Sequence, residues 1–102
     1  MRCYITITGT SFRHGSEFMK EGMMVDLVKE PDNEYDNEAI KVTMTPLGTV
    51  GYVANSVKTV IGECMSGGRL YDKIGDQAKA TILYVLPDGV IAYVDVSDFD
   101  DN

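Results

Sequence analysis

The chain has 102 residues, of which 44% are hydrophobic and 25% are charged, and its formal net charge is −7. These values are typical of one folded domain and exclude an intrinsically disordered chain. Long-tract nucleic-acid binding draws its affinity from many Lys and Arg contacts to phosphate. The acidic charge therefore disfavours a protein that coats duplex DNA, but it is compatible with a small site that contacts one or two nucleotides.

Short alternating segments rich in β-branched and aromatic residues run along the chain and predict strands. We expect six strands, at residues 2–8, 23–30, 39–45, 49–54, 78–86 and 90–96. Pro31 ends the second strand because proline cannot continue a central ladder, and Pro87-Asp88-Gly89 joins the last two strands in a tight hairpin. Many short strands with tight turns favour a mainly β protein, built as a small barrel or a sandwich.

One helix is expected between the fourth and fifth strands, where the hydrophobic period changes. Asn55 is a favourable N-cap. Apolar residues then follow at helical spacing, at Val57, Val60, Ile61 and Cys64. The segment Ser66-Gly67-Gly68 is expected to end this helix, because glycine readily takes the left-handed conformation found after a helix.

The cysteines and the single histidine bear on the compartment and on catalysis. Cys3 and Cys64 are far apart and lie in no metal-binding motif, which predicts reduced thiols in a cytoplasmic protein. His14 alone cannot complete a zinc site or a nucleophile pair, so we expect no metal, no cofactor and no enzyme. With no apolar run of membrane-spanning length, no membrane partner is expected; residues 1–97 form one domain and residues 98–102 an acidic tail.

The run EPDNEYDNEAIKV, residues 30–42, places five carboxylates within nine residues around one tyrosine. A calcium loop of the EF-hand type that opens at Asp32 needs glycine at its sixth position and glutamate at its twelfth. Asn37 and Thr43 occupy those positions, so this pattern fails. A solvated acidic turn and a recognition site are the other two interpretations.

The first of these interpretations, a solvated acidic turn, gives a structural role to residues of the run. Asn33 and Asp36 are residues that tight turns favour, because their side chains bond to nearby backbone. Tyr35 would then pack its ring on the barrel and keep its hydroxyl in water, and the run would be a folding signature with no ligand. The remaining carboxylates, Glu30, Asp32, Glu34 and Glu38, are expected to be solvated charges.

The segment LVKEPDNEYDNEAIKV (27–42), followed by GTVGYVANSVKTVI (48–61), resembles the HIRAN domain. Upstream, GTSFRHG (9–15) resembles the glycine-bounded aromatic loop of that family. The residues that match the family pattern are Lys29, Glu30, Pro31, Asn33, Tyr35, Asp36, Ala39, Ile40, Val42, Val50 and Gly51. The resemblance implies a six-stranded, OB-like barrel. It also implies a non-catalytic module that binds single-stranded DNA ends at damaged or stalled forks, and hence a link to DNA repair.

The same resemblance implies roles for particular residues. The rings of Tyr35 and Phe12 would supply flat faces on which a terminal base stacks. Asp36 would accept a hydrogen bond from a terminal 3′-hydroxyl, and Asn33 would hold the neighbouring base or sugar. A carboxylate repels phosphate, so Asp36 suits a DNA pocket only where a free hydroxyl arrives.

Phosphate contacts are expected from Arg13 and Lys58. Family members that bind DNA carry basic residues in the aromatic loop and at the start of the helix, whereas this chain has Ser11 and Ala54-Asn55-Ser56 at those places. The expected partners are a single-stranded DNA end and a helicase or another DNA-processing protein. The second hypothesis is a protein-interaction module that recruits its partner through the acidic surface or a sheet edge.

Overall fold

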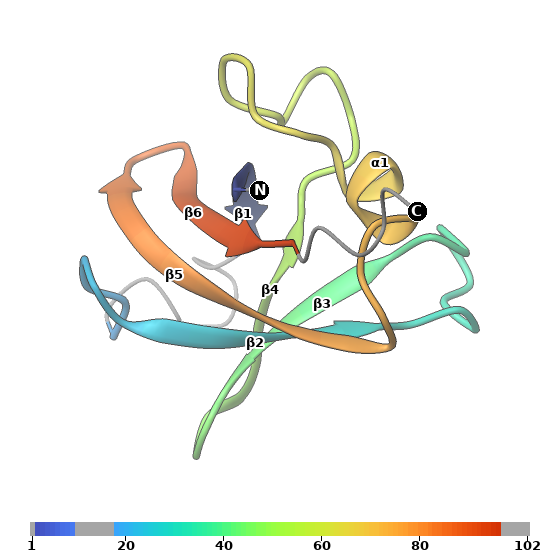
Figure 1. Cartoon of the computed structure of the whole chain (residues 1–102), viewed down its shortest axis with the longest axis horizontal. Coiled ribbons are helices and arrows are strands. Elements are labelled where there is room, and N and C mark those ends of the chain that lie inside the picture. Colours follow the sequence, from blue (N-terminus) through green and yellow to red (C-terminus); the bar gives the residue numbers. More distant parts are fainter. Residues whose placement is uncertain (1, 10–17, 97–102) are drawn as a thin grey trace.

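The computed structural model describes residues 2–9 and 18–96 (Figure 1). Its elements are β1 (Arg2–Thr8), β2 (Met24–Lys29), β3 (Ile40–Met44), β4 (Gly48–Val53), α1 (Gly67–Tyr71), β5 (Gln77–Leu86) and β6 (Gly89–Asp95). Every strand begins and ends within one residue of its predicted position, so the six predicted strands are confirmed.

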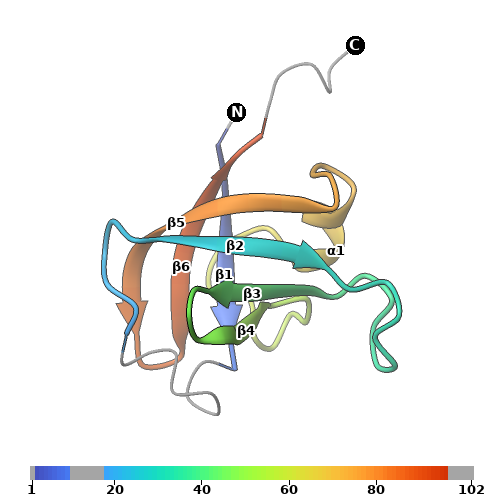
Figure 2. The same cartoon turned by 90° about the horizontal axis from the view of Figure 1, so that it is seen from below.

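The six strands close into an antiparallel barrel in the order β1-β4-β3-β2-β5-β6, and each strand has two neighbours (Figure 2). The β1–β6 ladder runs over six residue pairs, while the register of β5 against β6 shifts between Ile82 and Tyr84. Such a shift adds local bend and twist, which help a strand to curve around a barrel. The predicted mainly β barrel is therefore confirmed, and its closure gives every strand a second partner.

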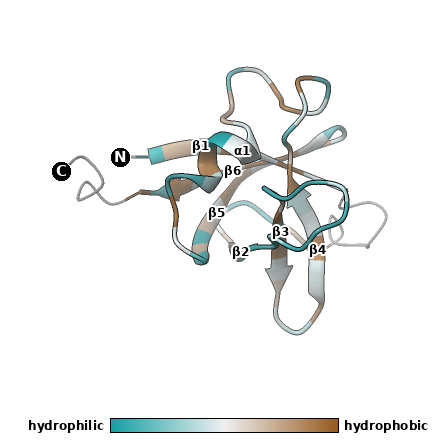
Figure 3. Ribbon diagram, turned by 90° about the vertical axis from the view of Figure 1, so that its right-hand side faces the viewer, coloured by the Kyte–Doolittle hydropathy of each residue, from teal (hydrophilic) through white to brown (hydrophobic). Residues whose placement is uncertain are grey.

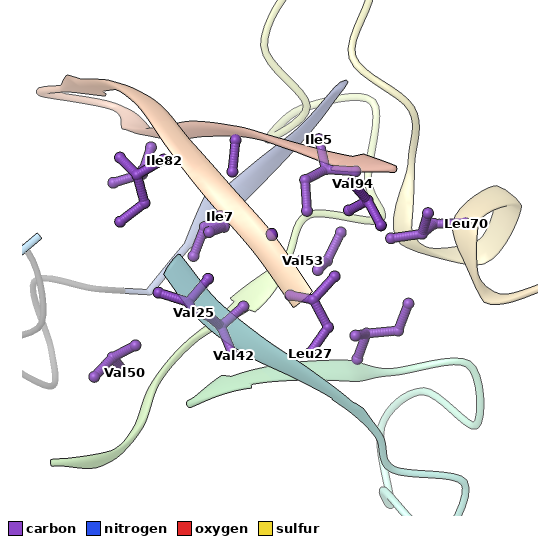
Figure 4. Close-up of a cluster of buried hydrophobic side chains, with 14 of the residues drawn as sticks. Ile5, Ile7, Val25, Leu27, Val42, Val50, Val53, Leu70, Ile82 and Val94 are labelled. Carbon is purple, nitrogen blue, oxygen red and sulfur yellow. The ribbon is translucent and has the colours of Figure 1, made fainter. Parts of the chain in front are cut away.

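Alternate strand residues point into the barrel and form its core (Figure 4). Ile5 and Ile7 in β1 and Leu27 in β2 are fully buried, as expected from the two-residue period of a strand. The short helix α1 adds Leu70, whose side chain points from the helix into the same cluster near Val94 (Figure 4). This contact fixes α1 against the barrel.

The single helix expected between the fourth and fifth strands is present as α1, but its predicted position over residues 55–64 is wrong. That segment is a series of turns that leads away from β4 (yellow-green in Figure 1), and Val57, expected on a buried face, is 97% exposed. Gly62 has a left-handed φ of +56°. The Ile61 N–H donates to the Oγ1 atom of the buried Thr6 at 3.0 Å rather than to a helical carbonyl. Because β-branched residues are weak helix formers, this tertiary bond outweighs the helical spacing.

The triplet Ser66-Gly67-Gly68 begins a helix instead of ending one. Ser66 is the N-cap of α1, and its Oγ atom accepts a hydrogen bond from the Arg69 N–H at 3.4 Å. A Cβ atom on Gly67 would lie only 3.2 Å from the carbonyl oxygen of Val53. The glycine therefore permits the close approach of α1 to the end of β4.

The cysteine thiols are both free; Cys3 is buried in the core and Cys64 is half-buried. Within residues 2–9 and 18–96, no helix is long and apolar enough to cross a membrane. The predicted acidic tail, residues 98–102, lies outside the described residues.

Truncation of Leu70 tests the contact between α1 and the barrel. Leu70→Ala should lower the free energy of unfolding by about 2–5 kcal/mol, because it removes a fully buried side chain and leaves a cavity. Leu47→Ala is the matched control, since Leu47 lies in the β3–β4 turn and is 45% exposed; we expect a change within about 0.5 kcal/mol. Urea denaturation followed by circular dichroism measures both, and equal losses would contradict the packing role of Leu70.

Candidate nucleic-acid interface

Two connections border a cleft of about 540 Å³, which we call the loop cleft. One is the 31–39 connection between β2 and β3, which is mostly hydrophilic (Figure 3), and the other is the 54–59 segment after β4. The cleft is lined by Thr8, Asn33, Tyr35, Asp36, Ala39, Tyr52, Val53, Ala54, Asn55, Ser56 and Thr59. A hollow of this size falls in the range of small-molecule sites.

Asn33 folds the 31–39 connection. Its Oδ1 atom accepts hydrogen bonds from the Tyr35 N–H at 2.9 Å and from the Asp36 N–H at 3.0 Å. Its Nδ2 atom donates to Oε1 of Glu30 at 2.7 Å. At the base of the connection, the Glu30 N–H donates to the carbonyl of Ala39 at 2.9 Å. The connection is thus a tight turn of the kind that asparagine favours, so this part of the turn interpretation is confirmed.

Tyr35 does not pack on the barrel, contrary to the turn interpretation. Its side chain is 88% exposed and lines the loop cleft. Its backbone N–H is held by Asn33 at 2.9 Å, which fixes the point from which the ring extends. The turn therefore presents an aromatic face to solvent, where it is available to a flat ligand.

The Asp36 carboxylate is held at both oxygens. Oδ1 accepts from the Glu38 N–H, and Oδ2 accepts from Nδ2 of Asn55, each at 2.9 Å. On the other side of Asn55, Oδ1 accepts from the Gly68 N–H at 2.7 Å. An ionised carboxylate has about four lone-pair positions, so Asp36 keeps capacity for a ligand donor.

Asn55 is a site residue that sequence reasoning missed. The sequence favours it as the cap of its own segment, whereas its side chain bridges Asp36 and the first turn of α1. Its amide carries a donor and an acceptor on one short side chain, and such a bridge needs both. The partners lie 19 and 13 residues away in the chain, so local patterns contained no signal for this contact.

Glu30 is not the solvated charge that the sequence favours. Its side chain is 30% exposed; Oε1 accepts from the Tyr52 hydroxyl at 2.8 Å, and Oε2 lies 3.9 Å from Nζ of Lys41. Tyr52 lines the loop cleft, and sequence reasoning missed it as well. The available signal was its alternation with the buried Val53, which places the Tyr52 ring on the outer face of β4.

The structure brings three of the six predicted site residues together, since Asn33, Tyr35 and Asp36 line one cleft. Lys58 is exposed on the turn whose neighbours Ser56 and Thr59 line the cleft, but Lys58 itself does not. The other two, Phe12 and Arg13, lie outside the described residues.

The acidic side chains of the described residues are also candidate ligands for a metal ion. In the ranges that the structure covers, no group of three or more His, Cys, Asp and Glu side chains is placed to hold a metal ion. What the loop cleft offers instead is one open aromatic ring, one carboxylate and several hydroxyl and amide groups. Such a set binds by stacking and hydrogen bonding.

Comparison with known proteins agrees with this geometry. The family model of the HIRAN domain matches residues 1–85, a span that contains every residue of the loop cleft. No curated protein and no solved structure gave a significant match. The HIRAN domain is generally a DNA-binding module and generally non-catalytic. Because the match covers most of the 102 residues, the chain belongs to the HIRAN domain family.

Proposed function

We propose that this chain is a non-catalytic module that recognises the 3′ end of single-stranded DNA, with a role in DNA repair or at stalled replication forks. The observation that carries the proposal is the juxtaposition of an 88% exposed Tyr35 ring and the Asp36 carboxylate in one cleft of about 540 Å³. The ring can stack on a base, and the carboxylate can accept a hydrogen bond from a hydroxyl.

Tyr35 supplies the stacking surface. Stacking of a base on an aromatic side chain contributes about 1–3 kcal/mol and tolerates any base, because every base has a π face. Asn33 holds the Tyr35 backbone, so the loop itself needs little ordering when the base arrives, and only the side-chain torsions of the exposed ring have to be fixed.

Asp36 supplies selectivity for a free end. An internal nucleotide presents a phosphate on its 3′ oxygen, and the carboxylate repels that charge. A terminal 3′-hydroxyl instead presents a donor, and a hydrogen bond to an ionised acceptor is among the stronger ones. The two bonds that Asp36 already accepts keep its oxygens in place.

Asn33 acts as a positioning residue for both groups. Its side chain makes three hydrogen bonds inside the connection, two of them to the backbone of Tyr35 and Asp36. Phe12 is the proposed second stacking face, and Arg13 and Lys58 are the proposed phosphate contacts. The free thiols of Cys3 and Cys64 support action in the cytoplasm, and the family resemblance supports a helicase or another DNA-processing protein as partner.

Loss of the Tyr35 ring should weaken binding. Tyr35→Ala is expected to reduce the affinity for a short strand with a free 3′-hydroxyl by about 5-fold to 150-fold, the equivalent of one lost base stack. Tyr35→Phe keeps the ring and should bind within about 2-fold of the parent chain. Fluorescence anisotropy at low salt measures the three affinities. Unchanged binding by Tyr35→Ala would exclude stacking on this ring.

Removal of the Asp36 charge should weaken the preference for a free end. The parent chain is expected to bind a 3′-hydroxyl strand at least about 10-fold more tightly than the same strand with a 3′-phosphate, and Asp36→Asn should reduce this ratio to about 3-fold or less. Glu34→Gln is the matched control, because Glu34 is an exposed carboxylate of the same connection that does not line the cleft. Thermal unfolding verifies that both variants are folded.

Two results would count against this assignment. One is a hydroxyl preference that survives in Asp36→Asn, which would place the end-reading group elsewhere. The other is a parent chain that binds none of the strands, which would favour the protein-interaction alternative and end the DNA proposal.

Asn33→Ala tests the positioning role. The variant should bind the 3′-hydroxyl strand about 5-fold more weakly, because its loop must be ordered on binding, while the ratio of hydroxyl to phosphate affinity stays the same. The N–H groups of Tyr35 and Asp36 should exchange faster with solvent, as followed by NMR. Asn37→Ala, an exposed position on the same connection, should change none of these values. Unaltered exchange in Asn33→Ala would remove the positioning role.

A further inference from the structure

A second hollow, of about 310 Å³, borders α1, and we call it the α1 hollow. It is lined by Asn55, Val57, Val60, Gly62, Cys64, Ser66 and Arg69. None of these residues is acidic, whereas the loop cleft contains Asp36. The two hollows therefore differ in the charge of the group that each one accepts.

The turn at residues 55–60 lies between the two hollows and contributes lining residues to both. Ser56 and Thr59 line the loop cleft, while Val57 and Val60, from the same turn, line the α1 hollow. Asn55 lines both. A chain-like ligand that occupies the loop cleft next to Asp36 thus needs to pass only Asn55 to reach the α1 hollow.

Arg69 gives the α1 hollow its charge. Among residues 2–9 and 18–96 it is the only cationic residue that lines either hollow, and it is exposed on α1. Within the described part of the chain, no carboxylate lies within 4.0 Å of its guanidinium group; the ion pairs found there involve Arg2, Lys41 and Lys79. A guanidinium presents its donors in a planar fork that matches phosphate oxygens, so an unpaired Arg69 suits a phosphodiester.

We propose that the α1 hollow is a second nucleotide subsite, which receives the part of the strand on the 5′ side of the terminal nucleotide and binds its phosphate through Arg69. The proposal rests on the proposed function of the loop cleft. Val57, which is 97% exposed, and Val60 form an apolar wall for the sugar or the base.

Charge also decides the direction in which the strand leaves the loop cleft. On the 31–39 side, Asp32 and Glu34 are exposed carboxylates and repel phosphates. On the side of Asn55, the described residues that line the α1 hollow include Arg69 and no carboxylate, and the one exposed carboxylate between two lining residues is Glu63. A strand whose terminal hydroxyl lies at Asp36 therefore runs across Asn55 toward Arg69. The proposal adds Arg69 of α1 to Arg13 and Lys58, the two phosphate contacts proposed above.

The test is a length series of one, two, four and eight thymidine nucleotides, each labelled at its 5′ end and carrying a free 3′-hydroxyl; only the single nucleotide lacks the part that the second subsite would receive. Arg69→Gln removes the proposed contact. Lys20→Gln removes the same charge from an exposed position that lines neither hollow, and it controls for net charge. Anisotropy is measured for each strand over a series of salt concentrations, and the 3′-phosphate form of each strand is included.

For the longer strands, Arg69→Gln should bind about 5-fold to 10-fold more weakly than the parent chain, with a salt slope shallower by about 0.7, the value for one lost phosphate contact on a single strand. For the shortest strand the loss should be under about 2-fold, and the preference for a 3′-hydroxyl should be the same at every length. Lys20→Gln should match the parent chain in all measurements.

A loss in Arg69→Gln that does not depend on strand length, or one that Lys20→Gln reproduces, overturns the second subsite while the proposed function stands. Failure of the parent chain to bind strands of any length overturns the proposed function, and the second subsite with it.

Discussion

The side-chain amide of Asn55 joins the three segments on which the site depends. It donates to Asp36 in the 31–39 connection and accepts from the Gly68 N–H in α1, while its own backbone begins the turn between the two hollows. A Cβ atom at position 68 would lie 3.0 Å from Oδ1 of Asn55 and 2.9 Å from Oε1 of Glu38, so a side chain there would crowd the Asn55 amide and displace the Glu38 carboxylate. The position of the Asp36 carboxylate is therefore coupled to the docking of α1 by Leu70.

If an acidic chain binds DNA, contacts at the binding site must offset the repulsion between its net negative charge and the phosphates. The net charge of −7 opposes any long contact with a polyanion. At one strand end the balance differs, because the terminal hydroxyl carries no charge and base stacking does not depend on charge. Arg69, without an ion-pair partner in the described residues, compensates part of the field at the place where the first phosphates would lie. Under the proposed function, the overall repulsion would disfavour binding along the length of a strand and add to a preference for its end.

The strands could be predicted because their sequence signals are local. The conformation of the connection after β4 could not be predicted, because it depends on a contact distant in the sequence. Alternation at Ile5 and Ile7 and the proline at position 31 act within a few residues, and the barrel preserves them. The 55–64 segment has helical spacing, yet the bond from Ile61 to Thr6 spans 55 residues of sequence and decides its conformation. Distant partners of this kind are invisible to a local pattern.

The residues of the candidate site likewise fall into those that local sequence patterns predict and those that they do not. Asn33, Tyr35 and Asp36 were found because they lie within one short run. Tyr52, Asn55 and Arg69 were missed because the fold, and not the sequence order, brings them to the two hollows. The carboxylates of the acidic run differ in their surroundings, since Glu30 is bonded to Tyr52 and paired with Lys41, whereas Asp32 and Glu34 are exposed.

The small footprint of the two hollows determines how such a module works. One base stack contributes about 1–3 kcal/mol, and a few phosphate contacts add a salt-dependent increment, whereas micromolar affinity requires about 8 kcal/mol. The chain alone is therefore expected to distinguish strand ends better than it holds them. Tethering to a second DNA-contacting protein converts this weak step into an intramolecular one, at an effective concentration in the millimolar range. When the module is tethered in this way, weak binding that is selective for the free hydroxyl is enough for it to locate a strand end. Tighter contacts along the strand would only reduce its selectivity for the end.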